Sequence, residues 1–339
     1  MGDMERSQIT AVIVSTQPAL DEKADPTPAH PLAPIAGKPV VAWVVDAAVA
    51  ASIRRIGVVA HDVAPADRDE LRNRTDNTVL EIVTPRADLT ESMLDVLSRL
   101  DPDLALSDAT DLLLIPAEAP HIDPAELRQL ISHHRAEANA ATLLATEVGN
   151  RTDTVIQRND AGEITSIHDV AVGGFTALLV RASLLIPAMR RASVDAWEPG
   201  VPMREIAGLL EQLGHRVGAL APRRDVESIS TLVDRSPIEM ELRDQVAQRL
   251  IECGVSIPDL RQVTIDATVT IGHGVTILPG SILEGDTVVG DDATIGPNTQ
   301  LTNAVIGTGA HVPHSVVNGV EVTPHEHVTP FSILGSKFR

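Results

Sequence analysis

The chain has 339 residues, of which 43% are hydrophobic and 22% charged, so it is long enough for about two globular domains. Its formal net charge of −20 argues against nucleic acid and against an anionic membrane surface as partners. A single cysteine, Cys253, allows no internal disulfide and fits a reducing cytoplasm. We expect no secretory signal and no membrane span, because the longest apolar stretch is too short to cross a bilayer.

Buried strands and helices alternate along the first two-thirds of the chain. Continuous aliphatic runs, typical of strands buried on both faces of a parallel sheet, occur at residues 9–14, 55–60, 79–84, 111–117 and 141–148. Helical patterns occur between them at residues 39–52, 89–100 and 123–138. This alternation predicts a Rossmann-like α/β domain with a mostly parallel sheet. His133 and His134 fall on the third helix, where we expect them at the surface.

A connector helix follows, over residues 236–254. Ser236 and Glu239 form a capping box, Pro237 occupies the first helical position, and Gly254 closes the helix. These signals predict a helix that starts after Ser236 and buries one face.

After this helix, one residue in six is aliphatic. The register runs from Ile265 to Leu301 and resumes, after a slip of one residue, at Ile306. Such a period predicts a short β-helix of hexapeptide repeats with about four coils. We expect its outward residues to include Thr268, Thr270, Val275, Thr287 and Val288.

The order of these parts resembles one bacterial family, the bifunctional N-acetylglucosamine-1-phosphate uridyltransferase and glucosamine-1-phosphate acetyltransferase. The segments PLAPIAGKPVVAWVVDAA and VTIDATVTIGHGVTILPGSILEG carry the resemblance. It implies a nucleotidyltransferase-like α/β domain and a short left-handed parallel β-helix. The implied boundaries are 1–8 for a flexible N-terminus, 9–230 for the α/β domain, 231–256 for the connector helix, 257–335 for the β-helix and 336–339 for a tail.

The phosphate-binding loop of that family does not match this sequence. Family members follow the first strand with a loop of the type A-A-G-x-G-T-R-M, whose glycine amides hold the triphosphate. The two glycine positions fall at Pro18 and Leu20, and the threonine and arginine positions fall at Asp21 and Glu22. Proline and leucine do not let the backbone approach a phosphate as glycine does. The resemblance therefore implies a lost triphosphate site.

Other site positions of the family are changed as well. The aspartate that holds magnesium aligns with Glu118, read either as a metal ligand or as a solvated carboxylate, and a second metal ligand aligns with Val233. Arg86, near the pocket mouth, and a protonated His30 are candidate anion contacts. The vestigial cleft candidates are Glu118, Arg86, Asp169, Gly173, Gly174 and Asp234. We expect none of them to be catalytic and no bound metal.

The C-terminal repeats do not carry the acetyltransferase site. Pro330 to Leu334 resembles the family motif P-F-x-Y-L, but Gly335 stands where the family has arginine. The later coils, which hold the catalytic histidine and the acetyl-CoA groove in the family, are not expected here, so acetyl transfer is not expected. His325 and His327 are read as solvent-exposed histidines rather than metal ligands, because the sequence offers no third ligand.

Three functions remain open at this point. The first is a non-catalytic relative, a pseudoenzyme with an assembly or regulatory role linked to UDP-N-acetylglucosamine and cell-wall precursor metabolism. The second is an active nucleotidyltransferase that uses UTP, N-acetylglucosamine-1-phosphate and Mg²⁺ in a remodelled site. The third is binding of a nucleotide sugar without turnover.

No cofactor is expected unless the transferase site is active. The expected partners are two further copies in a homotrimer built through the β-helix, or a full-length family enzyme, in the cytoplasm.

Overall fold

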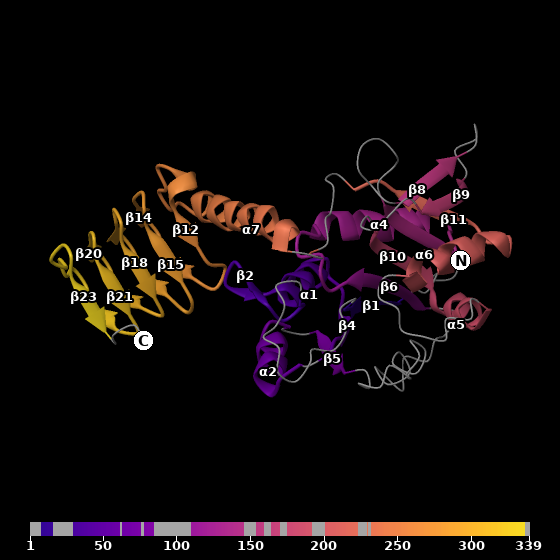
Figure 1. Ribbon diagram of the computed structural model, residues 1–339, viewed down its shortest axis with the longest axis horizontal. Coiled ribbons are helices and arrows are strands. Elements are labelled where there is room, and N and C mark those ends of the chain that lie inside the picture. The colour runs from indigo at the N-terminus through magenta and orange to yellow at the C-terminus, as the bar shows by residue number, and fades with distance from the viewer. Residues whose placement is uncertain are drawn as a thin grey trace, which may run out of the picture. The chain divides into compact units, whose positions relative to one another are not determined.

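The computed structural model describes residues 8–15, 30–61, 63–75, 78–84, 110–145, 154–158, 164–169, 175–191, 201–222, 229 and 232–335. The chain divides into two compact units (Figure 1). The α/β unit comprises Met1–Ala33 and Pro39–Arg235, and the β-helix unit comprises Pro34–Lys38 and Ser236–Arg339. Of the helices within the described ranges, none is long and apolar enough to cross a membrane.

A seven-stranded sheet with the order β11-β7-β10-β6-β1-β4-β5 forms the α/β unit (Figure 1). Its strands are β1 (Gln8–Val14), β4 (Arg55–Val59), β5 (Val79–Val83), β6 (Thr110–Pro116), β7 (Ala141–Ala145), β10 (Phe175–Arg181) and β11 (Val217–Leu220). Only β10 runs antiparallel to its two neighbours, β6 and β7. The predicted mostly parallel α/β sheet is therefore confirmed.

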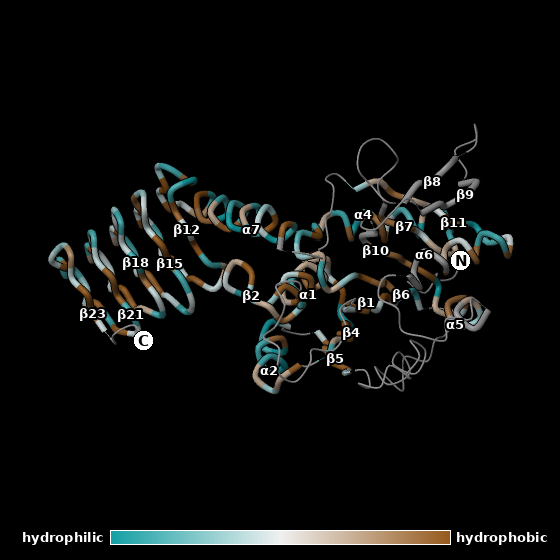
Figure 2. Tube along the Cα trace, in the orientation of Figure 1, coloured by the Kyte–Doolittle hydropathy of each residue, from teal (hydrophilic) through white to brown (hydrophobic). Residues whose placement is uncertain are grey.

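Both faces of this sheet are buried, as the continuous aliphatic strands require. On β1, Val12 and Val14 belong to one apolar core, whereas Ala11 and Ile13 belong to the core on the opposite face. The helices of this unit are α1 (Val40–Ala50), α2 (Pro65–Asn73), α4 (Pro124–Ala136), α5 (Ala182–Arg191) and α6 (Val201–Gln212). In Figure 2 the apolar colour follows α1 and the central strands, while α2 is largely polar. A separate antiparallel hairpin joins β8 (Thr154–Arg158) to β9 (Ile164–Asp169).

Helix α4 corrects one expectation from the sequence. Its N-cap Asp123 accepts a hydrogen bond from the Ala125 N–H, as the capping pattern predicts. His134, however, is buried to 3% exposure instead of lying at the surface. Its Nδ1 lies 2.8 Å from Thr142 Oγ1, and its Nε2 lies 3.7 Å from Asp111 Oδ1. Because both ring nitrogens meet polar partners, the imidazole can be buried without a large desolvation cost.

The connector helix α7 (Leu232–Glu252) begins about one turn earlier than the capping pattern at Ser236 predicts. Ser236 and Pro237 lie inside the helix, so Ser236 is not its N-cap. A proline so near the start removes a single backbone hydrogen bond, and Asp234 in the first turn interacts favourably with the helix dipole. The predicted end is confirmed, because Gly254 adopts φ +92° and its N–H donates to the Ile251 carbonyl at 2.9 Å.

Three parallel sheets wind into the β-helix (Figure 1). The five-stranded sheet contains β12 (Thr264–Ile265), β15 (Ile282–Glu284), β18 (Gln300–Thr302), β21 (Val316–Asn318) and β23 (Ile333–Gly335). The four-stranded sheet contains β13 (Thr270–Ile271), β16 (Val288–Val289), β19 (Val305–Ile306) and β22 (Glu321–Val322). The three-stranded sheet contains β14 (Thr276–Ile277), β17 (Thr294–Ile295) and β20 (His311–Val312), and a 3-10 turn (Leu260–Gln262) precedes β12. The predicted hexapeptide β-helix, left-handed as the resemblance implied, is therefore confirmed.

Two residues of each repeat point inward, not one. From Val275 to Val317 the aliphatic residue of each repeat is buried, and so is the small residue two positions before it, because side chains alternate along a strand. The small inward residues are Ser281, Thr287, Ala293, Thr299, Ala304, Ala310 and Ser315. The expectation that Val275 and Thr287 face outward is therefore wrong, since both are 0% exposed, whereas Thr270 and Val288 are exposed.

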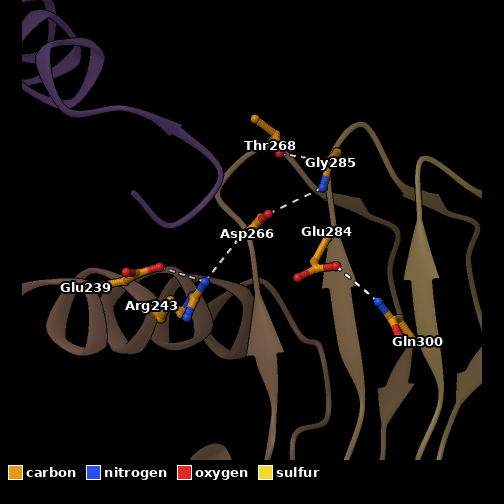
Figure 3. Close-up of polar contacts among 7 residues, drawn as sticks. All are labelled: Glu239, Arg243, Asp266, Thr268, Glu284, Gly285 and Gln300. Atoms are coloured by element: carbon orange, nitrogen blue, oxygen red, sulfur yellow. Dashed lines mark hydrogen bonds and ion pairs between the residues drawn. The ribbon is translucent and has the colours of Figure 1, made fainter. Parts of the chain in front are cut away.

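Asp266 joins three segments of the β-helix unit (Figure 3). Its carboxylate lies 3.7 Å from Arg243 of α7 and accepts a hydrogen bond from the Gly285 N–H of the next coil at 3.4 Å. The turn between β2 (Pro34–Ile35) and β3 (Lys38–Pro39) packs on the same side chain: Gly37 has φ +89°, and a Cβ there would lie 2.5 Å from Asp266 Cβ. No other residue type fits this turn without a clash.

Burial raises the pKa of the Asp266 carboxyl, and the neighbouring Glu284 and Glu239 add to the effect, although Gly285 and Arg243 oppose it. The folded chain therefore holds this proton more tightly than the unfolded chain does. It follows that Asp266 contributes stability below its ordinary pKa of 3.8, and this contribution is lost as the pH rises through the raised value.

The Asp266→Asn variant tests this pH dependence. We expect the thermal midpoint of the wild type minus that of the variant to be larger at about pH 4 than at about pH 7, because only the wild type gains a proton on folding. Circular dichroism at matched pH measures it. Asp286→Asn, an exposed carboxylate on the following turn, is the control and should show no such trend. A difference that shrinks on acidification would contradict the assignment.

Candidate functional site

The carboxyl ends of three neighbouring parallel strands define the candidate site. In the sheet register Val14 of β1 pairs with Val59 of β4 on one side and with Pro116 of β6 on the other. In open α/β sheets, ligands bind in the crevice outside this edge. We call Ser15, His61 and Glu118 the edge cluster, because each follows one of these strands within two residues.

Ser15 and Glu118 are joined by a buried hydrogen bond. The Ser15 hydroxyl donates to Glu118 Oε1 at 2.9 Å, and the two residues are only 2% and 1% exposed. Backbone contacts fix both ends: the Ser15 N–H donates to the Val59 carbonyl at 2.8 Å, and the Glu118 carbonyl accepts from the Ile229 N–H at 2.9 Å. The Glu118 side chain is therefore directed toward the end of β1 and away from solvent.

Two buried histidines lie in the same unit. His61 is 3% exposed and comes directly after Ala60, at the end of β4. His30 is 2% exposed, and its Nδ1 accepts a hydrogen bond from the Leu32 N–H at 3.2 Å. A neutral His30 therefore carries its proton on Nε2. Imidazoles of this kind can move a proton or contact an anion near neutral pH.

The acidic candidates from the sequence lie on separate elements. Glu118 belongs to the edge cluster, Asp169 ends β9 in the separate hairpin, and Asp234 lies in the first turn of α7. Arg86, Gly173 and Gly174 fall outside the described residues, as does the acidic loop 16–29. Sequence reasoning missed Ser15 and His61. The signal that could have found them is their place immediately after a buried parallel strand.

The described residues do not fit a magnesium site. Mg²⁺ requires oxygen ligands in near-octahedral geometry. Of the two aligned metal positions, Glu118 is buried against Ser15, and Val233 has no oxygen on its side chain and is 81% exposed. Within the described ranges there is also no group of three or more His, Cys, Asp or Glu side chains that could hold a metal ion.

Comparisons with known proteins agree with the two units. The family model of the MobA-like NTP transferase domain matches residues 29–238, and that of the bacterial transferase hexapeptide (six repeats) matches residues 268–303. Among curated proteins, the bifunctional protein GlmU of Streptomyces avermitilis is 28% identical over 237 residues, which cover 66% of this chain and 49% of that protein.

Two further relatives carry the same name. The bifunctional protein GlmU of Caldanaerobacter subterraneus is 26% identical over 325 residues, covering 88% of this chain and 68% of that protein. GlmU of Rubrobacter xylanophilus is 32% identical over 219 residues, which cover 61% of this chain and 47% of that protein. The matches therefore span about half the length of the first and third relatives and about two-thirds of the second.

Replacing Ser15 by alanine tests the edge cluster. Because the change removes a hydrogen bond to a buried carboxyl group, we expect the free energy of unfolding of the α/β unit to fall by about 1–3 kcal/mol. Urea unfolding followed by tryptophan fluorescence measures it, since Trp43 and Trp197 both belong to this unit.

Ser132→Ala on the exposed side of α4 is the matched control and should change stability by less than about 0.5 kcal/mol. The double variant Ser15→Ala/Glu118→Gln should lose less stability than the two single losses added together, because the two side chains contact each other. Additive losses would mean that the hydrogen bond contributes nothing.

Proposed function

The chain belongs to the family of MobA-like NTP transferase domains, and from that premise we propose that it is a GlmU-like protein whose transferase site no longer performs nucleotidyl transfer. At the general level, the chain is a member of a nucleotidyltransferase family and carries a hexapeptide β-helix. The finer proposal is a role in assembly or regulation close to UDP-N-acetylglucosamine and cell-wall precursor metabolism, in the cytoplasm.

The burial of Glu118 is the observation that carries this proposal. A carboxylate that binds a metal ion with its substrate must present its oxygens to the cleft. Glu118 is 1% exposed, and one of its oxygens already accepts the Ser15 hydroxyl. The residue in the metal position therefore acts as a structural anchor between β1 and β6.

The residues at the other positions that align with the family's nucleotide site also argue against nucleotidyl transfer. Val233 offers no ligand atom, and the glycine positions of the family loop are Pro18 and Leu20 in this sequence. Asp21 and Glu22, which stand in place of threonine and arginine, would repel a triphosphate. Each charge-assisted contact contributes about 1.5–3 kcal/mol, so losing several weakens nucleotide binding by orders of magnitude.

An active transferase with a remodelled site is the second candidate. It is favoured by the extent of the family match, residues 29–238, and by the buried polar groups Ser15, His61 and Glu118 at the edge where ligands bind in such sheets. Calorimetric titration with UTP and Mg²⁺, and separately with UDP-N-acetylglucosamine, separates the candidates. If the titration shows heat of binding for UDP-N-acetylglucosamine alone, and no turnover follows, the chain is a nucleotide-sugar-binding protein.

The direct test of catalysis is release of pyrophosphate. We expect the folded chain, given UTP, Mg²⁺ and N-acetylglucosamine-1-phosphate, to release no more pyrophosphate than a control without protein. The Glu118→Asp variant should stay inactive, because Val233 and the loop positions remain changed. Turnover of about 1 s⁻¹, an ordinary rate for an enzyme, would overturn the proposal.

We also propose that the β-helix assembles the chain into a homotrimer. A solenoid of few coils has little core of its own, because each coil contacts only its neighbours. Val288 and Val305, on successive strands of one sheet, are 41% and 46% exposed, and Phe331 and Ile333 are 82% and 70% exposed. These apolar side chains would be covered by further copies, or by a full-length family enzyme that shares the β-helix.

Light scattering of the purified chain decides the oligomeric state. We expect a mass of three times 36.0 kDa, and a smaller mass for the Val288→Glu/Val305→Glu variant, because buried charges without partners oppose association. Val79→Glu, which changes a 53% exposed valine on β5, should leave the mass unchanged. A wild-type mass of one subunit at micromolar concentration would refute the trimer.

A further inference from the structure

One outward column of the β-helix ends in two histidines. Along the three-stranded sheet, the outward positions of successive coils are Ser256, Thr276, Thr294, His311 and His327, each paired in parallel register with the next. Neighbouring parallel strands lie about 4.8 Å apart, so consecutive side chains in such a column are in contact. The last two coils thus place two imidazoles one above the other.

The backbone fixes this pair. The His311 N–H donates to the Glu326 carbonyl at 2.8 Å, and the Val328 N–H donates to the His311 carbonyl at 3.0 Å. The two rings meet edge to face, with centroids 5.2 Å apart and an interplanar angle of 89°. Their Nδ1 atoms lie 3.4 Å apart. His327 is exposed and His311 is half-buried, so solvent reaches the pair.

This separation matches the bite of a metal ion. Two imidazole nitrogens, each about 2.0–2.1 Å from a tetrahedral Zn²⁺, lie about 3.3–3.4 Å apart. We propose that His311 and His327 together chelate a divalent transition-metal ion of the zinc class through their Nδ1 atoms. Each ring then carries its proton on Nε2, and water occupies the other positions. With two protein ligands the site binds more weakly than structural sites with four or catalytic sites with three.

The charges around the pair favour a cation. The acidic residue Glu326 precedes His327, and its carboxylate accepts hydrogen bonds from the Thr323 hydroxyl, at 2.7 Å, and from the Thr323 N–H, at 2.9 Å. Thr294, the next residue down the column from His311, adds no positive charge.

The other histidines of these coils have different surroundings. His314 stacks on Phe331, with ring centroids 5.4 Å apart, and contacts Asn298 at 3.5 Å. His325 adopts φ +60° at a corner, where its ring lies next to the α-carbon of Gly309. Neither of them contributes to the His311–His327 contact, so they supply matched controls. The sequence drew attention to His325 and His327, two residues apart, whereas the fold pairs residues 16 apart.

If the His311–His327 pair does not bind metal, a metal titration gives a different result. Without a metal, one Nδ1–H donates to the other Nδ1, and the pair is only a hydrogen bond. Metal binding requires the Nδ1 lone pair of both rings, so the metal competes with protons and binding weakens in acid. Metal titration of single variants distinguishes the two cases.

The experiment titrates the untagged full chain with ZnCl₂ by calorimetry at about pH 7.5 and about pH 5, and with Co²⁺ by visible absorption. The variants are His311→Gln and His327→Gln, and the controls are His314→Gln and His325→Gln. Loss of even an outer-shell group costs about 10–100-fold in metal affinity, so each pair variant should bind at least about tenfold more weakly. The controls should bind as the wild type does, and binding should be lost at the lower pH.

Two outcomes would overturn the chelate. One is that the wild type binds no zinc at ZnCl₂ concentrations up to about 1 mM. A dissociation constant above about 1 mM corresponds to negligible specific binding. The other is binding that persists at full affinity in the double variant His311→Gln/His327→Gln. Circular dichroism confirms that all variants retain the fold, which is expected because neither ring contributes to the inward column of the β-helix.

Discussion

Parallel pairing of β1 with both β4 and β6 is the constraint on which the α/β unit depends. A strand bonded on both edges and covered on both faces has no surface left for water, so its residues must be aliphatic, as Ala11 to Val14 are. Because parallel strands end at the same edge, their next residues meet there. The polar groups Ser15, His61 and Glu118 consequently gather at the point where the buried aliphatic residues stop, and each must find a partner or remain in contact with water.

Glu118 illustrates the conflict between a structural and a functional carboxylate. A buried carboxyl group is stable only when hydrogen bonds replace its lost water, and the Ser15 hydroxyl supplies one of these bonds. A magnesium ligand instead places a carboxylate oxygen at one corner of an octahedron of oxygen ligands. The Ser15 hydroxyl engages one of the two Glu118 oxygens, and Val233 carries no side-chain oxygen, so the two positions that align with metal ligands have different side-chain chemistry here.

Much of the fold could be predicted, because its signals are local. Aliphatic runs indicate strands, and the hexapeptide period indicates the β-helix, since both follow from which side chains must be buried. The errors arose where burial depends on distant partners. His134 is buried because Thr142 and Asp111 satisfy it, and Ser15 meets Glu118 across 103 positions of sequence. Thr287 was misplaced because its hydroxyl donates to the Glu284 carbonyl within the coil, which makes burial of a polar residue inexpensive.

The two units differ in where they can build a site. In the α/β unit the central strands are buried on both faces, so the polar groups of the edge cluster lie where these strands end. In the β-helix the inward positions from Val275 to Val317 hold aliphatic or small residues, whereas the outward residues differ from coil to coil. The spacing of parallel strands sets the distance between outward neighbours, so one substitution on each of two adjacent coils is enough to bring two side chains into contact. The change from Thr276 and Thr294 to His311 and His327 along one column is such a case, and it leaves the inward residues Val312 and Val328 unaffected. New chemistry can therefore arise on the outside of a solenoid at little cost to its fold.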